Sequence, residues 1–306
     1  MRKYNIIVDT DPGTDDSIAL AVAAVYFKAD LCALISSYGN VDGNKTHQNL
    51  VNLTNLLGIH TKVLKGSLTP LEKNNFTSTD FHGTNGLCGV TLPQCVYTDS
   101  AEDSLLCLYE VIKYYRKIKY VAVAPLTNLA TLIERFPDVE QYIDEVIIMG
   151  GGFKIANVSH NAEFNFSLDG KAVQKVLQSS LNKVLTPLDM THKTAFSIEE
   201  IADIISSDRN SLDERNYAFW AMAQLLYRYF DTSIAHNEPG AIIHDATTFA
   251  YLLDPTQCSI EEVSVVADDY GAIHTSPIGS KIKIIETVNK QFLKELLKST
   301  YKNLRG

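Results

Sequence analysis

The sequence predicts a single-domain α/β fold with a mainly parallel, open β-sheet that is covered by helices on both faces. Short apolar, β-branched runs alternate with helical patterns through the first two thirds of the chain. Repeated units of this kind are typical of parallel sheets whose strands are buried on both faces. No composition shift or linker divides the 306 residues, so we expect one domain over residues 1–306, with its ligand site at the C-terminal ends of the strands.

The N-terminal half contains strands and helices in regular alternation. The apolar runs predict strands at Tyr4–Val8, Leu31–Ser36, Lys62–Leu64, Tyr120–Ala124 and Val146–Met149. Apolar residues spaced three and four apart predict helices at Asp15–Lys28, Gly43–Leu57, Ser104–Tyr115 and Thr127–Phe136. These lengths suit each type, because buried strands run four to eight residues and helices are longer.

Two stretches depart from this alternation. Gly66 to Ser100 is polar and rich in Gly, Thr and Asn, and it is longer than a simple connection requires. Asp208 to Phe230 predicts a helix with many aromatic side chains, namely Tyr217, Phe219, Trp220, Tyr227, Tyr229 and Phe230. These rings either pack in the core or form a wall for a flat ligand. Further strands are predicted at Glu261–Val266, Ile273–Thr275 and Lys281–Thr287, and a closing helix at Lys290–Tyr301.

Composition and charge exclude several classes of partner. The chain has 36 acidic and 27 basic residues, a net charge of −9 with neutral histidines, which argues against binding of nucleic acid. The uncharged stretch from Ser17 to Phe27 has 11 residues, short of the ~20 that span a membrane. Five cysteines form no CxxC pair. We therefore expect a cytoplasmic protein with reduced thiols and no membrane segment.

The densest chemical signal is the octet Asp9–Asp16, which contains four aspartates. It follows an apolar strand and precedes a helix, the position where α/β sheets bind ligands. Helix capping accounts for one or two of these carboxylates. The others repel one another unless they are protonated or held by a cation. Oxygen ligands without Cys or His indicate a hard cation, Ca²⁺ or Mg²⁺; the alternative is capping and turn chemistry alone.

Two other interpretations of the octet fail. An aspartyl-nucleophile phosphatase also has an Asp-x-Asp after a strand, but it requires a downstream lysine for the phosphate, and no convincing counterpart is present. An EF-hand loop requires Glu at its twelfth position. That position is Leu20 when counted from Asp9 and Val22 when counted from Asp11.

The octet resembles the N-terminal signature of the inosine–uridine-preferring nucleoside hydrolases, also called N-ribohydrolases. Further matches follow in the family's order: Tyr38–Asn40, Phe81–Leu87, Ala124–Ala130, Met149–Gly152, Asn157, Ala162–Asn165 and Ile243–Asp245. The resemblance implies a Rossmann-like core, a homodimer or homotetramer, and hydrolysis of the N-glycosidic bond of ribonucleosides to ribose and free base in nucleoside salvage.

The resemblance also implies a site. Its Ca²⁺ ligands would be Asp11, Asp16, Asp245 and the backbone carbonyl of Thr127, with a slip of one residue open for the carbonyl. Asp11 would act as general base on the attacking water, and His244 as the acid for the leaving base. The sugar hydroxyls would be bound by Asp15, Asn40, Asn157, Glu163 and Asn165, and His82 would contact the base.

Some of these residues also have a purely structural interpretation. Asn40 is a turn residue, Glu163 and Asn165 flank Phe164 as in a half-buried strand, and His244 belongs to a helix-start pair. Two functional alternatives remain as well. They are a hydrolase of a related N-riboside such as nicotinamide riboside, and a nucleoside-binding module without catalysis. Base preference stays open, with Tyr227, Tyr229 and His236 as candidate base contacts.

Overall fold

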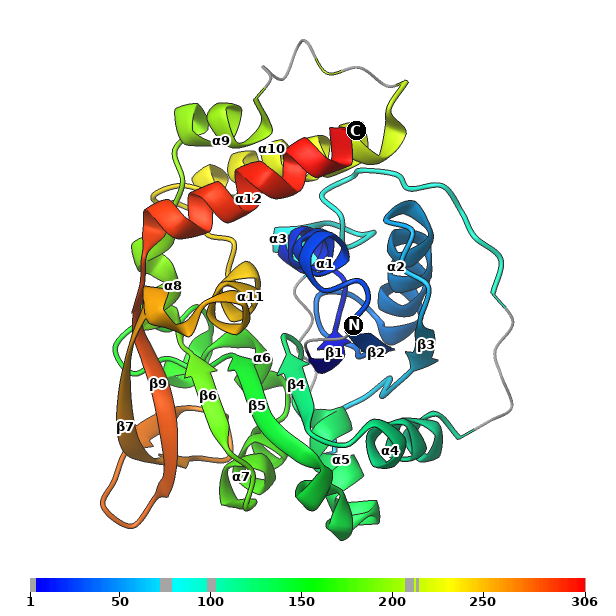
Figure 1. The fold of residues 1–306 in the computed structure, drawn as a ribbon. Helices are drawn as coiled ribbons and strands as arrows, with labels where there is room; N and C mark the ends of the chain where they lie inside the picture. The colour runs from blue at the N-terminus through cyan, green and yellow to red at the C-terminus, as the bar shows by residue number, and fades with distance from the viewer. Residues whose placement is uncertain (1–3, 72–78, 98–102, 207–211, 213–214, 306) are drawn as a thin grey trace.

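The central feature of the computed structural model is a mixed β-sheet (Figure 1), and the structure describes residues 4–71, 79–97, 103–206, 212 and 215–305. Within these residues nine strands form one sheet in the order β3-β2-β1-β4-β5-β6-β9-β7-β8. Their bounds are β1 Asn5–Thr10, β2 Leu31–Ser36, β3 Lys62–Lys65, β4 Ile118–Ala122, β5 Ile143–Met149, β6 Lys183–Thr186, β7 Cys258–Ala267, β8 Ile273–Thr275 and β9 Ser280–Val288.

Neighbouring strands pair in parallel from β3 to β9 in the sheet order, and β7 pairs antiparallel with both β9 and β8. β1 lies between β2 and β4, so both its edges are paired and its apolar residues are fully buried. Ile6 and Val8 belong to one hydrophobic cluster, whereas Ile7 belongs to another. The continuous apolar run thus reflects burial on both faces, as the sequence predicted.

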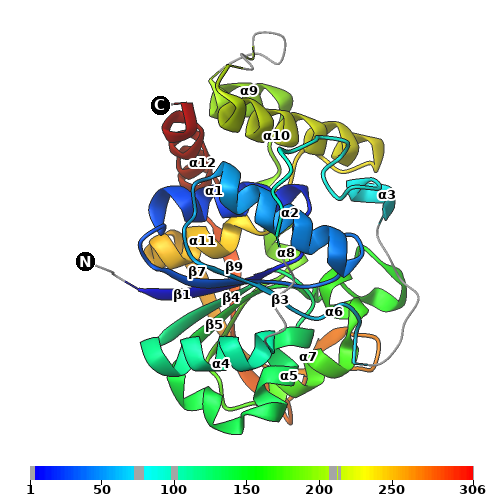
Figure 2. The ribbon, with the colours of Figure 1, turned by 90° about the vertical axis from the view of Figure 1, so that its right-hand side faces the viewer.

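Helices cover both faces of the sheet (Figure 2). One layer contains α1 Thr14–Tyr26, α2 Gly43–Leu56, α10 Tyr217–Ala235, α11 Ala246–Leu253 and α12 Lys290–Arg305. The opposite layer contains α4 Ser104–Tyr115, α5 Thr127–Arg135 and α7 Gly170–Gln178. Shorter helices are α3 Thr79–His82, α6 Phe164–Leu168, α8 Leu188–Thr191 and α9 Ile198–Ile205.

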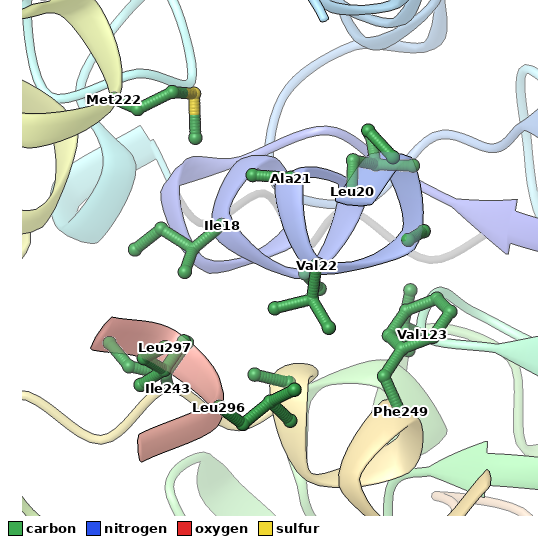
Figure 3. Close-up of a cluster of buried hydrophobic side chains, with 14 of the residues drawn as sticks. Ile18, Leu20, Ala21, Val22, Val123, Met222, Ile243, Phe249, Leu296 and Leu297 are labelled. Carbon is green, nitrogen blue, oxygen red and sulfur yellow. The ribbon is translucent and has the colours of Figure 1, made fainter. Parts of the chain in front are cut away.

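Helix α1 is surrounded by apolar neighbours from distant parts of the chain. Ile18 and Val22 lie near Ile243, Phe249 and the leucines of α12 in one buried cluster (Figure 3). This burial fixes the helix that follows the aspartate octet. None of the described helices is both long and apolar enough to cross a bilayer.

The predicted α/β class with a mainly parallel sheet is confirmed, and several bounds differ. β4 begins and ends two residues before Tyr120–Ala124, so Val123 and Ala124 lie beyond the strand. The aromatic helix α10 begins at Tyr217, where Asn216 accepts the Phe219 N–H, and continues to Ala235. Most of the predicted part before Tyr217 lies outside the described residues. β6, α7, α9 and α11 were not predicted.

Candidate active site

A cavity of about 430 Å³ lies where β1, β2, β4 and β5 end. Most of the predicted site residues line it: Asp15, Asp16, Asn40, His82, Asn157, Glu163, Asn165, His244 and Asp245. They come from six separate stretches of the chain, and parallel strands bring these stretches to one edge of the sheet. Two predicted residues, Asp11 and Thr127, are buried and are not part of the lining.

Three carboxylates form the floor of the cavity. One oxygen each of Asp15, Asp16 and Asp245 lies within 4.8 Å of the other two, and all three residues are buried. The turn after β1 positions the first pair: the Gly13 N–H donates to Asp16 Oδ2 at 3.0 Å, closing the cap of α1. Asp245 lies directly before α11. Helix starts from opposite ends of the chain therefore supply this floor.

Asp11 lies beside the floor with one oxygen unpaired. Its Oδ2 accepts the Asn40 backbone N–H at 2.7 Å, whereas its buried Oδ1 has no hydrogen-bond partner among the described residues. A Cβ at Gly39 would lie 2.0 Å from Asp11 Oδ2, so only glycine permits this approach. An unpaired buried carboxylate oxygen is costly unless a cation or a proton meets it.

Burial raises the pKa of all four acidic groups. The pKa of Asp15 is raised to about 8, by burial first and then by the charge of Asp16. Burial first, and then acidic neighbours, also raise the pKa values of Asp11 and Asp245 well above the ordinary value. Four carboxylates that disfavour their own charge, with oxygen donors only and one oxygen unpaired, fit a hard divalent cation.

The side chains of Asp9 and Asn40 are held by hydrogen bonds to other parts of the protein. Asp9 accepts hydrogen bonds from the Tyr120 hydroxyl and from Asn128 Nδ2, each at 2.8 Å. The Asn40 Nδ2 group donates to the Asp11 carbonyl at 3.0 Å and to Asp16 Oδ2 at 2.9 Å. Asn40 therefore holds two aspartates of the octet in place while it lines the cavity.

Thr127 does not face the cavity. It is the first residue of α5, and its carbonyl oxygen accepts the Thr131 hydroxyl at 2.7 Å within that helix. Its own hydroxyl donates to Asp169 Oδ2 at 2.7 Å. Val123 lines the cavity instead, and its carbonyl oxygen accepts a hydrogen bond from Asn165 Nδ2 at 3.3 Å.

Glu163 and Asn165 belong to a helix start, not to a strand. Glu163 caps α6, and its carboxylate accepts the N–H groups of Asn165, Phe166 and Gly151 at 2.8 to 3.0 Å. Burial raises the pKa of Glu163 to about 7, against the lowering effect of these bonds. Asn157 Oδ1 accepts the Phe164 N–H at 2.9 Å, which leaves its amide N–H₂ to face the cavity.

The two predicted histidines are uncharged in this environment. Burial, followed by the nearby His236, lowers the pKa of His82 to about 3. Burial and the nearby His192 and His82 likewise lower the pKa of His244 to about 3. The Thr14 N–H donates to His82 Nδ1 at 3.3 Å, so the proton of His82 is on Nε2. His244 Nδ1 lies 2.8 Å from the Thr191 hydroxyl.

Aromatic and polar side chains form the outer wall of the cavity. Tyr229 and His236, two candidate base contacts, line it, and Phe81 lies 5.5 Å and 5.0 Å from their rings. Tyr227 is buried in the hydrophobic core. Packing in the core is therefore confirmed for Tyr227, and Tyr229 lines the cavity as well as packing in the core, so its role as a wall for a flat ligand stays a prediction. The sequence reasoning missed His192, Ser233 and Glu238; His192 follows the unpredicted β6 and α8, and Glu238 lies between α10 and the predicted His244.

Comparisons with known proteins agree with this geometry. The model of the family "Inosine-uridine preferring nucleoside hydrolase" matches residues 6–295. The pyrimidine-specific ribonucleoside hydrolase RihA of Enterobacter sp. is 32% identical over 255 residues, which cover 82% of this chain and 79% of RihA. The RihA of Photobacterium profundum is 30% identical over 257 residues, covering 82% of this chain and 80% of its own.

Solved structures share the fold. A purine-preferring ribonucleoside hydrolase from Gardnerella vaginalis superposes with a TM-score of 0.85 at 23% identity and covers 98% of both chains. The family match over nearly the whole chain, the relatives at 30% and 32% identity and the common α/β fold lead to one conclusion. The chain belongs to the inosine–uridine-preferring nucleoside hydrolase family.

Proposed function

We propose that this protein hydrolyses the N-glycosidic bond of ribonucleosides with the help of Ca²⁺. The observation that carries the proposal is the carboxylate floor beneath an aromatic outer wall, together with the unpaired Oδ1 of Asp11. Asp11, Asp16, Asp245 and the carbonyl of Val123, in place of Thr127, would hold the cation. A bound Ca²⁺ supplies positive charge that lowers the pKa of a coordinated water and grips vicinal hydroxyls.

The remaining steps belong to the chain's own residues. Asp11 accepts the proton of the attacking water, whose oxygen forms a bond to C1′ of the ribose. The C1′–N bond breaks, and its electron pair goes to the nitrogen of the departing base. Asp15, Asn157, Glu163 and Asn165 bind sugar hydroxyls, and Asn40 holds Asp11 and Asp16 for this task. The acidic surroundings favour the positive charge that develops on the sugar.

The histidines act as neutral hydrogen-bond donors in this proposal. Because the pKa of His82 and of His244 is about 3, neither is an imidazolium at neutral pH. His82 donates from Nε2 to the leaving base. His244 does so from Nε2, because its Nδ1 contacts the Thr191 hydroxyl at 2.8 Å, which fixes the ring. This refines the acid role that the sequence suggested for His244.

The test is a comparison of kcat/KM for inosine, uridine, cytidine and adenosine, with and without EDTA. We expect free base from at least one of these substrates, and loss of turnover when Ca²⁺ is removed. Release of no base from any of them would refute the proposal. Calorimetric binding without product would instead support a nucleoside-binding module, which the presence of both Asp11 and His244 disfavours.

We further propose a cytoplasmic enzyme of nucleoside salvage that forms a homodimer or homotetramer. The five cysteines are all free, as suits a reducing compartment. Light scattering on the purified protein measures the assembly, and a monomer at micromolar concentration would contradict this part of the proposal.

A further inference from the structure

The loop between β5 and α6 forms one side of the cavity, and its tip contacts a turn from the C-terminal part of the chain. Residues 153–162, which we call the cavity loop, contribute residues 156–158 to the lining. At the tip, the exposed His160 ring stacks on the Tyr270 ring, with 4.2 Å between the ring centroids and 9° between the ring planes. Tyr270 belongs to the turn between β7 and β8 and is not part of the lining.

The base of the cavity loop is fixed by hydrogen bonds at both ends. Asp189 of α8 accepts the Phe153 N–H at 2.6 Å and the Lys154 N–H at 2.9 Å. At the other end, Asn157 Oδ1 accepts the Phe164 N–H at 2.9 Å, which joins the loop to α6. The direction of the Asn157 amide in the cavity therefore depends on the conformation of the residues between these two ends.

The tip of the cavity loop has a backbone conformation that residues other than glycine rarely adopt. His160 and Asn161 follow one another with φ values of +62° and +57°. The Val158 N–H donates to the Ala162 carbonyl at 3.4 Å, a long hydrogen bond that closes the tip. Left-handed residues of this kind persist where surrounding contacts determine their conformation. The stack on Tyr270 is such a contact.

The turn that carries Tyr270 is itself held in place. Asp268 Oδ1 accepts the Tyr270 and Ala272 N–H groups, each at 2.9 Å. Gly271 has a φ of +80°, and a Cβ there would lie 2.1 Å from the Phe166 carbonyl oxygen of α6. The turn therefore packs directly on α6 and offers the tip of the cavity loop a fixed surface.

We propose that Tyr270 is a positioning residue for the substrate sugar. By stacking on His160, it holds the cavity loop in the conformation that presents the Asn157 amide to a sugar hydroxyl. The inference rests on the proposed function and deepens it, because it connects a residue outside the cavity to one that binds the substrate. A loop without this stack samples other conformations, so the Asn157 contact must be ordered when the substrate binds, and binding is weaker.

The first experiment asks whether the stack orders the cavity loop. Hydrogen exchange of residues 153–164 is measured in the wild type, in Tyr270→Ala, in His160→Ala, and in Tyr270→Phe, which keeps the ring. The hydrogen-bonded N–H groups of Val158 and Phe164 report on the loop. Loss of one aromatic pair is expected to speed exchange of this segment about fivefold in both alanine variants. Tyr270→Phe should exchange like the wild type.

The second experiment asks whether the ordered loop acts through Asn157. KM and kcat at saturating Ca²⁺ are measured for the best of the four nucleosides, in Tyr270→Ala, in Asn157→Ala and in the double variant. We expect Tyr270→Ala to raise KM about fivefold with little change in kcat, because a binding contact is lost. In the Asn157→Ala background the same substitution should add nothing, because the contact that it orders is already absent. Tyr270→Phe should restore the wild-type KM.

The matched control is Tyr114→Ala. Tyr114 is an exposed tyrosine of α4 whose ring contacts the Tyr115 ring, and neither residue lines the cavity. This variant should leave both the exchange of residues 153–164 and KM at their wild-type values.

The outcomes separate the inference from the proposed function. Equal exchange in the wild type and in Tyr270→Ala would overturn the ordering of the loop by the stack, whether or not the protein is active. A KM that rises as much in the Asn157→Ala background as in the wild type would overturn the action through Asn157. If no nucleoside is hydrolysed while exchange changes as expected, it is the proposed function that fails.

Discussion

The aspartates of the octet have the same chemistry but different environments. Asp9 is satisfied by Tyr120 and Asn128, and burial raises its pKa to about 7. Asp16 accepts the Gly13 N–H and closes the start of α1. Asp11 alone keeps a buried oxygen without a partner among the described residues. Partners, rather than residue type, therefore separate the structural aspartate from those that face a cation or a water.

Replacing Asp11 by Asn tests its proposed roles as a metal ligand and as the general base. The amide keeps the shape of the side chain but removes the charge and the base, so we expect kcat to fall about 10²–10⁴-fold. Steady-state kinetics at saturating Ca²⁺ measures this loss. The control is Asp42→Asn, because Asp42 caps α2 away from the cavity and Asn caps equally well. An Asp11→Asn variant with near-normal kcat would remove Asp11 from the mechanism.

The lowered pKa of the buried His82 predicts how the free energy of unfolding depends on pH. Its pKa is about 3 in the folded protein, below the ordinary value of 6.5. As the pH falls, His82 therefore binds a proton in the unfolded chain before it does so in the folded protein. The free energy of unfolding decreases below about pH 6.5, by about 2 kcal/mol at pH 5. Urea unfolding at pH 7 and pH 5 measures the loss, and His82→Gln, which cannot titrate, should reduce it. An equal loss in both proteins would show that His82 is not responsible.

At the scale of elements, helix starts support both the fold and the site. Glu163 caps α6 with three N–H groups, Asp169 accepts the Ala172 N–H at the start of α7, and Asp103 caps α4. In α6 the capping carboxylate is also a cavity group. A residue that satisfies the backbone can therefore face a ligand at the same time.

The cap of α4 can be tested apart from the cavity. Asp103 accepts the Leu105 and Leu106 N–H groups at 3.1 and 3.2 Å. Asp103→Ala is expected to lower the free energy of unfolding by about 1 kcal/mol, whereas Asp103→Asn keeps the cap and costs less. Urea midpoints measure both, with kcat unchanged. Equal destabilisation by Ala and Asn would assign the effect to the Arg135 ion pair instead.

At the scale of the whole molecule, the cavity joins the two ends of the chain. Asp11 and Asp16 follow the first strand, and Asp245 precedes α11, which packs against α1. A cation held by these residues would bind only the folded chain. The acids would then cost less to bury, because the cation offsets the repulsion that raises their pKa values.

Calcium should therefore stabilise the fold. At 100 times its dissociation constant, a ligand that binds only the native state adds about 2.7 kcal/mol to the free energy of unfolding. Differential scanning calorimetry with Ca²⁺ and with EDTA measures the shift in Tm. Asp245→Asn should abolish most of the difference. A Tm that is the same with and without Ca²⁺ in the wild type would argue against a cation at this floor.

Helices and strands that show a clear residue pattern within their own segment were predictable from the sequence. The alternation of β-branched runs and helical spacing located β1 to β5 and their helices within a few residues. β6 escaped notice because its four residues begin with a lysine. Lys183 is buried there because its Nζ donates to the Leu177 and Ser179 carbonyls. These two carbonyls lie at the C-terminal end of α7 and directly after it, and because that helix was not predicted, the partners of Lys183 were not predicted either.

The sequence by itself determined the α/β class, the octet after the first strand, and most of the polar residues that meet in the cavity, because these follow from periodicity and from the sheet edge. Only the tertiary structure decided that Val123 rather than Thr127 lines the cavity, that burial lowers the pKa of His82 and His244, and that Glu238 belongs to the lining. Carbonyl direction depends on which residue begins a helix, and a pKa depends on burial. Both are set by contacts between residues far apart in the chain.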